Sequence, residues 1–186
     1  FEAITNSVQA IEEAKIKNGK ITIEIERENN LLTSDADRGI TDIVGFIIKD
    51  NGIGFDAQNY DAFITSDTTH KASIGGRGIG RLMWLAAFEK VEIDSVFEEK
   101  KIFKKRKFIF AALNDGVKDM TCIEDDHAVR ETSVHLIGFR DKYRKTCPKK
   151  MDTIATLVVE QFLDVFIRAD CPVIILKDAA SGEEVS

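Results

Sequence analysis

Two glycine-rich stretches decide how this sequence folds. Asp50-Asn51-Gly52-Ile53-Gly54 directly follows the apolar run 43–49, and Gly75-Gly76-Arg77-Gly78-Ile79-Gly80 leads into the apolar run 79–88. Glycines ahead of a helix let backbone N–H groups approach an anion closely, and the helix dipole adds a favourable potential. The second stretch is therefore a candidate phosphate-binding loop, although a glycine-rich turn can also merely join two elements.

Neither stretch matches the common phosphate-binding fingerprints. A P-loop needs Gly-x-x-x-x-Gly-Lys followed by Ser or Thr, which both stretches lack. A dinucleotide fingerprint needs Gly-x-Gly-x-x-Gly, but the sixth position is Ala57 counted from Gly52 and Arg81 counted from Gly76. Both classes of site are thereby excluded. Arg77 and Arg81 can either add charge to the second stretch or point to water.

The residues around these stretches predict strands and amphipathic helices. Apolar spacing predicts a helix over residues 1–17 that ends at Asn18-Gly19 with a left-handed glycine cap, and alternation predicts a strand over 21–26. The remaining predictions are strands at 43–49, 90–97, 102–113, 133–139 and 173–177, a turn at 62–64, and helices at 79–88 and 151–168. These elements favour a two-layer α+β fold, with helices packed on one face of a mixed, largely antiparallel sheet.

Composition limits the class of protein. The chain has 186 residues, of which 44% are hydrophobic and 31% are charged, as in a single globular domain. Its net charge of −6 argues against broad electrostatic binding to nucleic acid, and the basic run 104–107 is interpreted as a solvated hairpin strand. No apolar run approaches the roughly 20 residues of a membrane span. Three separated cysteines, Cys122, Cys147 and Cys171, predict free thiols and a cytoplasmic location.

Four motifs in order resemble one superfamily. Glu2-Ala3-Ile4-Thr5-Asn6, the 50–54 stretch, the 75–80 stretch and Glu131-Thr132-Ser133-Val134 together span most of the chain. This order resembles the Bergerat-fold (GHKL) ATP-binding domains of DNA gyrase, the ninety-kilodalton heat-shock chaperone, sensor histidine kinases and MutL. The resemblance implies the Bergerat fold and binding of ATP with Mg²⁺.

The resemblance also implies roles for the base half of the site. Asp50 would accept a hydrogen bond from the exocyclic amine of adenine, because an ionised carboxylate only accepts. Its plain alternative is a turn-forming Asp at a strand end. Gly52 and Gly54 would lie at the base, with Gly54 letting it approach the backbone, and Thr132 would contact it directly or through water.

For the phosphate half, the resemblance implies that the 75–80 stretch cradles the phosphates. Asn6 would hold Mg²⁺ through its amide oxygen, since this cation prefers oxygen ligands. Glu2 lies one helical turn earlier and would act as the general base for the attacking water; its plain alternative is a solvated residue on a terminal turn. Gln9 departs from the acidic residue that relatives often carry, which leaves the local hydrogen-bond network open.

The polar stretch from Thr65 to Lys71 corresponds to the mobile lid of the superfamily. Thr68, Thr69 and Lys71 would meet the β- and γ-phosphates when the lid closes. His70 is either a further contact or a solvated loop residue. His127 and His135 have no metal-like spacing with the cysteines, so no zinc site is expected.

Taken together, the expected function is binding and hydrolysis of ATP, coupled to lid closure and ATP-dependent homodimerisation. Glu2 favours hydrolysis because histidine kinases generally lack this glutamate. A histidine-kinase-type phosphotransfer domain and a non-hydrolysing nucleotide sensor remain as alternatives. We expect residues 1–186 to be a single ATP-binding domain of a longer protein, lacking its N-terminal segment and downstream domains, so that turnover by this piece alone is slow or absent. The process and the client, whether nucleic acid or protein, do not follow from the sequence.

Overall fold

The computed structural model describes residues 1–28, 40–65, 80–112, 116–125 and 129–186. Within these ranges, eight strands form one sheet in the order β5-β4-β3-β6-β2-β1-β7-β8. Neighbouring strands are antiparallel except β1 and β7, which run parallel. The strands are β1 (Lys20–Arg27), β2 (Ile43–Asp50), β3 (Phe88–Glu99), β4 (Ile102–Ala111), β5 (Val117–Glu124), β6 (Glu131–Phe139), β7 (Val173–Asp178) and β8 (Glu184–Val185).

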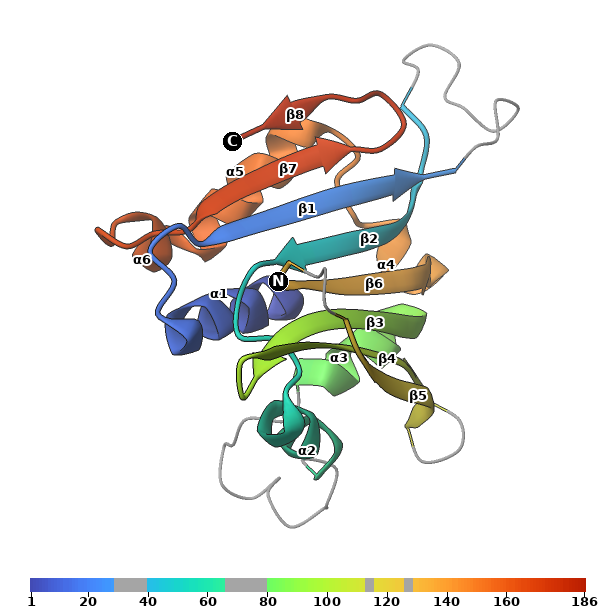
Figure 1. Ribbon diagram of the computed structural model, residues 1–186. Coiled ribbons are helices and arrows are strands. Elements are labelled where there is room, and N and C mark those ends of the chain that lie inside the picture. The colour runs from blue at the N-terminus through green and yellow to red at the C-terminus, as the bar shows by residue number, and fades with distance from the viewer. Residues whose placement is uncertain (29–39, 66–79, 113–115, 126–128) are drawn as a thin grey trace, which may run out of the picture.

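Helices form the second layer. Those of the described ranges are α1 (Glu2–Ala14), α2 (Ala57–Thr65), α3 (Gly80–Ala87), α4 (Asp141–Arg144), α5 (Met151–Gln161) and α6 (Leu163–Phe166). In Figure 1, α1, α3 and α5 lie behind the sheet, while α2 lies beyond its lower end. The predicted arrangement, with helices on one face of a mixed, largely antiparallel sheet, is confirmed. Each of these helices falls short of the length and apolarity needed to cross a membrane.

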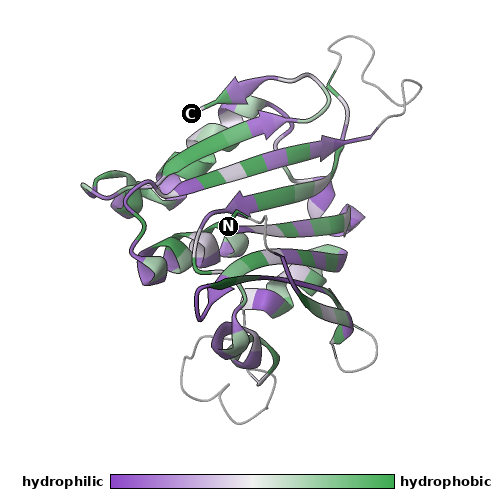
Figure 2. Cartoon of the chain, viewed as in Figure 1, coloured by the Kyte–Doolittle hydropathy of each residue, from purple (hydrophilic) through white to green (hydrophobic). Residues whose placement is uncertain are grey.

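Alternating side chains explain why one face of the sheet carries the core. Ile21, Ile23 and Ile25 of β1 are at most 3% exposed beneath the helices. The intervening residues of β1 face the uncovered side, where Glu24 pairs with Lys49 of β2 at 2.8 Å. Figure 2 shows the resulting alternation of hydrophilic and hydrophobic bands along β1. The prediction of a half-buried strand that pairs antiparallel with β2 is confirmed.

The first helix ends earlier than predicted. It stops at Ala14, and Lys15 takes the left-handed conformation (φ 53°) that was expected of glycine. Gly19 has a different reason to be glycine: a Cβ there would lie 2.6 Å from Cγ2 of Ile11 and 3.0 Å from Cβ of Pro172. Its bare backbone lets α1 pack closely against the start of β7, so its role is spatial and not conformational.

Residues 62–64 form part of a helix, and the predicted turn is wrong. Helix α2 begins after Asp56, whose carboxylate accepts a hydrogen bond from the Asn59 N–H at 2.8 Å. An aspartate in this position satisfies an otherwise unpaired N–H of the first turn. None of the residues of α2 is fully buried, so the helix lacks the apolar stripe by which a sequence reveals a helix.

Two further differences lie in the second half of the chain. The predicted helix over 151–168 is interrupted at Phe162 (φ −114°, ψ 27°), whose buried ring packs edge-on against Phe1 at 6.1 Å between centroids. Strand β5 was not predicted, because most of its side chains are exposed and no alternation marks it. Tertiary packing and strand pairing decide both features, and neither leaves a local pattern in the sequence.

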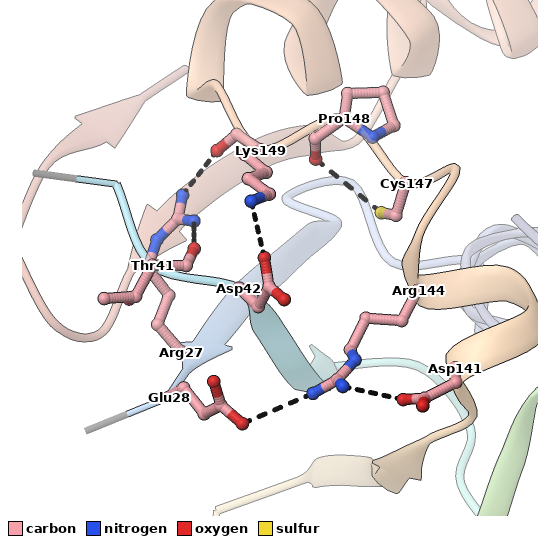
Figure 3. Close-up of polar contacts among 9 residues, drawn as sticks. All are labelled: Arg27, Glu28, Thr41, Asp42, Asp141, Arg144, Cys147, Pro148 and Lys149. Carbon is pink, nitrogen blue, oxygen red and sulfur yellow. Dashed lines mark hydrogen bonds and ion pairs between the residues drawn. The ribbon is translucent and has the colours of Figure 1, made fainter. Parts of the chain in front are cut away.

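A polar cluster ties together the ends of β1 and β2 that lie farthest from Asp50 (Figure 3). The guanidinium of Arg27 donates to the carbonyls of Thr41 at 2.9 Å and Lys149 at 2.7 Å, and its Nε donates to the carboxylate of Asp178. The ammonium of Lys149 pairs with Asp42 at 2.6 Å. The cluster joins β1 and β7 to the segments that precede β2 and α5.

Candidate functional site

A cavity of about 310 Å³ opens where β2 ends, and α1, α2 and α3 contribute to its walls. This volume lies at the lower end of the range of roughly 300–1,000 Å³ that is typical of ligand pockets. The predicted site residues that line it are Glu2, Asn6, Asp50, Gly54, Gly80 and Thr132. Those that fall outside the described residues are Thr68, Thr69, Lys71, Gly75, Gly76, Arg77, Gly78 and Ile79.

Asp50 is a buried carboxylate of this cavity. It is 5% exposed, and its carboxylate accepts hydrogen bonds from the Ser7 hydroxyl at 2.8 Å and from the Gly52 N–H at 2.9 Å. Burial raises the pKa of Asp50 to about 6, and the nearby Glu131 acts in the same direction, while the two hydrogen bonds lower it. No lysine or arginine of the described ranges forms an ion pair with Asp50.

Gly52 and Gly54 bring the chain close to its neighbours after β2. A Cβ at Gly52 would lie 2.6 Å from the carbonyl carbon of Ala10, and the next N–H, that of Ile53, donates to the Ala10 carbonyl at 2.9 Å. Gly54 has φ +78°, and a Cβ there would lie 2.8 Å from Oγ of Ser95. Gly54 therefore needs glycine both for its backbone conformation and for space.

Thr132 lies beside Asp50 in the sheet, because the two residues are paired in register between β6 and β2. Its hydroxyl is 2.8 Å from the hydroxyl of Ser95, which also accepts a hydrogen bond from the Phe55 N–H at 2.9 Å. Thr132 and Ser95 are both buried, at 4% and 0% exposed. Together the two hydroxyls link β6 and β3 to the loop that carries Gly54.

Glu2 and Asn6 also line the cavity, one turn apart on α1. The carboxylate of Glu2 lies against Gly80, at a position where any side chain would collide with it. Gly80 is the first residue of α3 and the last of the glycine-rich stretch. The fold thus brings the first motif of the sequence to the end of the third.

An aromatic wall closes the cavity near α3. Phe63 and Trp84 both line the cavity, and their ring centroids are 6.2 Å apart. The guanidinium of Arg81 lies over the ring of Phe63 at 4.9 Å and over that of Phe110 at 5.7 Å. Arg81 is 6% exposed, so the alternative in which its side chain points to water is wrong. Cation–π contacts of this kind favour a buried guanidinium.

Two residues that build the site were missed in the sequence. Ser7 lies among the apolar positions of α1, and Ser95 is fully buried in β3 two residues after the buried Ile93. A polar residue at a core-facing position was the available signal in both cases, since buried polar groups need partners. The partners themselves, Asp50 and Thr132, are 43 and 37 residues away in sequence and were not predictable from local pattern.

The described residues of the cavity offer oxygen atoms of three kinds. The carboxylate of Asp50 offers acceptor lone pairs within a buried wall. When it is ionised, a carboxylate accepts hydrogen bonds and cannot donate them. Asn6 offers an amide oxygen, the hard donor that Mg²⁺ accepts. Glu2 offers a carboxylate beside the end of the glycine-rich stretch.

Comparison with known proteins identifies the fold. No family model matches the chain, and no curated protein matches it in sequence. Among solved structures, the chain is similar to the 43K ATPase domain of Thermus thermophilus gyrase B, solved in complex with an aminocoumarin. The TM-score is 0.61 at 16% identity, and the match covers 99% of this chain and 43% of the gyrase chain. At this identity the similarity shows the fold.

Proposed function

We propose that this chain, which has the Bergerat fold of the gyrase B ATPase domain, binds ATP with Mg²⁺ and hydrolyses it. The observation that carries the proposal is Asp50, a buried carboxylate that lines the cavity and forms no ion pair with a lysine or arginine of the described residues. A buried charge that its own fold leaves unpaired marks a functional site more often than a structural one. The exocyclic amine of adenine would donate to it.

The base half of the cavity supports adenine over guanine. Both oxygens of Asp50 already accept one hydrogen bond from the protein, and each retains a lone pair. Guanine would present a carbonyl where adenine presents its amine, and two acceptors would then face each other. A site built around one hydrogen bond discriminates strongly against an analogue that cannot make it. Gly54 lines the same cavity as Asp50.

The phosphate half is supported by the position of α1 against α3. In our proposal, Asn6 holds Mg²⁺ through its amide oxygen, and the 75–80 stretch, of which Gly80 is described, binds the phosphates. Glu2 would accept a proton from the water that attacks the γ-phosphate. Its carboxylate lies beside Gly80, where that phosphate would end. We further propose that residues 65–71 form a lid that closes over the nucleotide, and that two copies of the chain pair when ATP is bound.

Binding and base selectivity can be measured together. Trp84 is the single tryptophan of the chain and lines the cavity, so its fluorescence should change on titration with Mg-ATP. At ~100 times the dissociation constant, a ligand specific for the folded state adds about 2.7 kcal/mol to the free energy of unfolding. We expect this stabilisation with ATP and little with GTP at the same concentration. Equal stabilisation by GTP would contradict the role of Asp50.

Hydrolysis is tested by two matched substitutions on α1. Glu2 and Glu13 both line the cavity, near opposite ends of the helix. Loss of a general base typically slows a reaction by about 10²–10⁴-fold. We expect Glu2→Gln to lower ATP turnover by at least about 100-fold while ATP still binds, and Glu13→Gln to leave turnover unchanged. ATP binding without turnover by the unsubstituted protein would refute hydrolysis and support the nucleotide-sensor alternative.

A further inference from the structure

The basic run from Lys104 to Lys107 divides between the two faces of β4. Lys105 and Lys107 lie on the uncovered face, where both pair with Asp94 of β3, at 3.3 and 2.8 Å. Arg106 points to the helix side, opposite Ser95 in the register of β3 and β4. The interpretation of this run as a solvated strand therefore holds for its lysines on the uncovered face but not for Arg106.

Arg106 contacts the segment that enters α2. Its Nη1 donates to two consecutive carbonyls, that of Phe55 at 2.7 Å and that of Asp56 at 2.6 Å. Its guanidinium lies over the ring of Tyr60 at 4.5 Å and over that of Phe97 at 5.1 Å. Within the described ranges no carboxylate forms an ion pair with it. Its partners there are these two carbonyls, the two rings and the Sγ of Cys122, to which Nη2 donates at 3.9 Å.

That segment is a wall of the cavity. Gly54, Phe55 and Asn59 all line it, whereas Arg106 does not. Three side chains form hydrogen bonds with the wall. The Phe55 N–H donates to Ser95, and the Asn59 amide donates to the Gly54 carbonyl at 3.0 Å. Arg106 donates to the carbonyls of Phe55 and Asp56. Of the three, Arg106 is the one whose side chain comes from β4, a strand that contributes no residue to the lining of the cavity.

We propose that Arg106 is a positioning residue that fixes the Gly54–Asn59 wall and thereby sets the affinity of the site for the adenosine half of its ligand. The inference rests on the proposed function, because it assigns the base to the wall beside Asp50. A wall that is free to move would have to be ordered by each binding event, and that ordering lowers affinity. Arg106 forms no hydrogen bond with Glu2 or Gly80, to which the proposed function assigns the phosphate half.

Arginine suits this place better than lysine. A guanidinium is planar and stacks on aromatic rings while its N–H groups donate in its plane, whereas an ammonium is a compact, strongly hydrated charge. Lysine at position 106 can still reach carbonyl oxygens, but it loses much of the contact with Tyr60 and Phe97. The substitution Arg106→Lys should therefore preserve part of the effect, and Arg106→Ala should lose it.

The test compares adenosine with Mg-ATP, titrated into the whole chain and followed by Trp84 fluorescence and calorimetry. We expect Arg106→Ala to weaken both ligands by about the same factor, on the order of tenfold, which corresponds to about 1.4 kcal/mol. The ratio of the two affinities, which reports the phosphate half, should stay unchanged. Arg106→Lys should weaken both by about threefold, again with an unchanged ratio.

The matched control is Lys107→Ala, the neighbouring cation on the other face, which should bind both ligands as the unsubstituted chain does. If Arg106→Ala binds adenosine with unchanged affinity, or if it also changes the affinity ratio, Arg106 does not act on the base wall. Should the alanine variant fail to fold, Arg106→Lys decides by the same criteria. Failure of the unsubstituted chain to bind either ligand refutes the proposed function itself and the inference with it.

Discussion

Two buried carboxylates lie at opposite ends of the central strands, and the fold treats them differently. Asp178 is 4% exposed and receives Arg27 together with the N–H groups of Ala180 and Ser181, at 2.9 and 3.2 Å. Asp50 is 5% exposed and receives a hydroxyl and one N–H, with no cation among the described residues. The two carboxylates are similarly buried. A cation balances the charge of Asp178, whereas the described residues give Asp50 hydrogen bonds alone.

The pKa values of the two groups shift in opposite directions. Burial opposes ionisation of both, but at Asp178 the hydrogen bonds from Arg27 and the two N–H groups outweigh it and lower the pKa. At Asp50 burial prevails and raises the pKa to about 6. In our proposal, Asp178 is a structural carboxylate and Asp50 is one that receives a ligand.

The largest expected effect is a loss in the free energy of unfolding when Asp178 loses its cation. Arg27→Ala leaves Asp178 buried without its cation and leaves two carbonyls without their donor. Removing one partner of a buried pair typically costs about 3–5 kcal/mol, and urea unfolding should show a loss of this size. Lys49→Ala is the control, because its pair with Glu24 is partly exposed and should contribute under about 1 kcal/mol. Equal losses in the two variants would refute the structural role.

The next effect is the pH dependence of stability without nucleotide. Asp50 has a folded-state pKa of about 6, above the value of 3.8 for an ordinary Asp. Its charge therefore lowers stability above pH 6, and this cost disappears as the pH falls from about 6 to about 4. Relative to Asp50→Asn, the unsubstituted chain should gain about 3 kcal/mol over that interval in urea unfolding, from two pKa units at about 1.4 kcal/mol each.

Asp178→Asn provides the opposite sign. The folded-state pKa of Asp178 is lowered, so its stabilising charge is fully present above the unfolded value and is lost as the pH falls through the lower folded value. The unsubstituted chain should therefore lose stability relative to Asp178→Asn at acidic pH. A dependence of the same sign at both positions would show that the two carboxylates do not differ in the way described.

The smallest expected effect is the difference in stability between alanine variants at two glycines of similar backbone conformation. Gly54 and Gly182 have φ +78° and +75°, but a Cβ at Gly182 would meet nothing within 4 Å. Gly182→Ala should cost only the left-handed conformation, about 1 kcal/mol, and Gly54→Ala about twice that because it also crowds Ser95 and Phe97. Melting and ATP titration check both, with ATP binding weakened only by Gly54→Ala. Equal effects would remove Gly54 from the site.

Sequence patterns predicted those parts of the molecule whose cause is local. Alternation in β1 and the apolar stripe of α1 both correspond to buried faces, and the ordered motifs predicted the Bergerat fold. Asp50 was singled out because its motif, in order with three others, resembles the superfamily. In β1 and α1, residue type and spacing alone carry the physical constraint.

The remaining features depend on contacts between distant segments. Arg27 and Asp178 are 151 residues apart, and Arg106 and Phe55 are 51 apart, so no window of sequence contains either pair. Helix α2 lacks a buried stripe and β5 lacks a buried face, so their periodicity is weak. Such elements are fixed by the sheet edge or the capping residue that they join, which only the assembled fold supplies.

The most direct test is a calorimetric titration of Mg-ATP into the unsubstituted chain, Asp50→Asn and Asp178→Asn at neutral pH. Hydrogen bonds to charged groups contribute about 1.5–3 kcal/mol, so Asp50→Asn should weaken binding by roughly 10- to 100-fold. Asp178→Asn, at the opposite end of the strands, should bind as the unsubstituted chain does. Unchanged affinity in Asp50→Asn, or equal losses in both variants, would contradict the assignment of Asp50 to the nucleotide base.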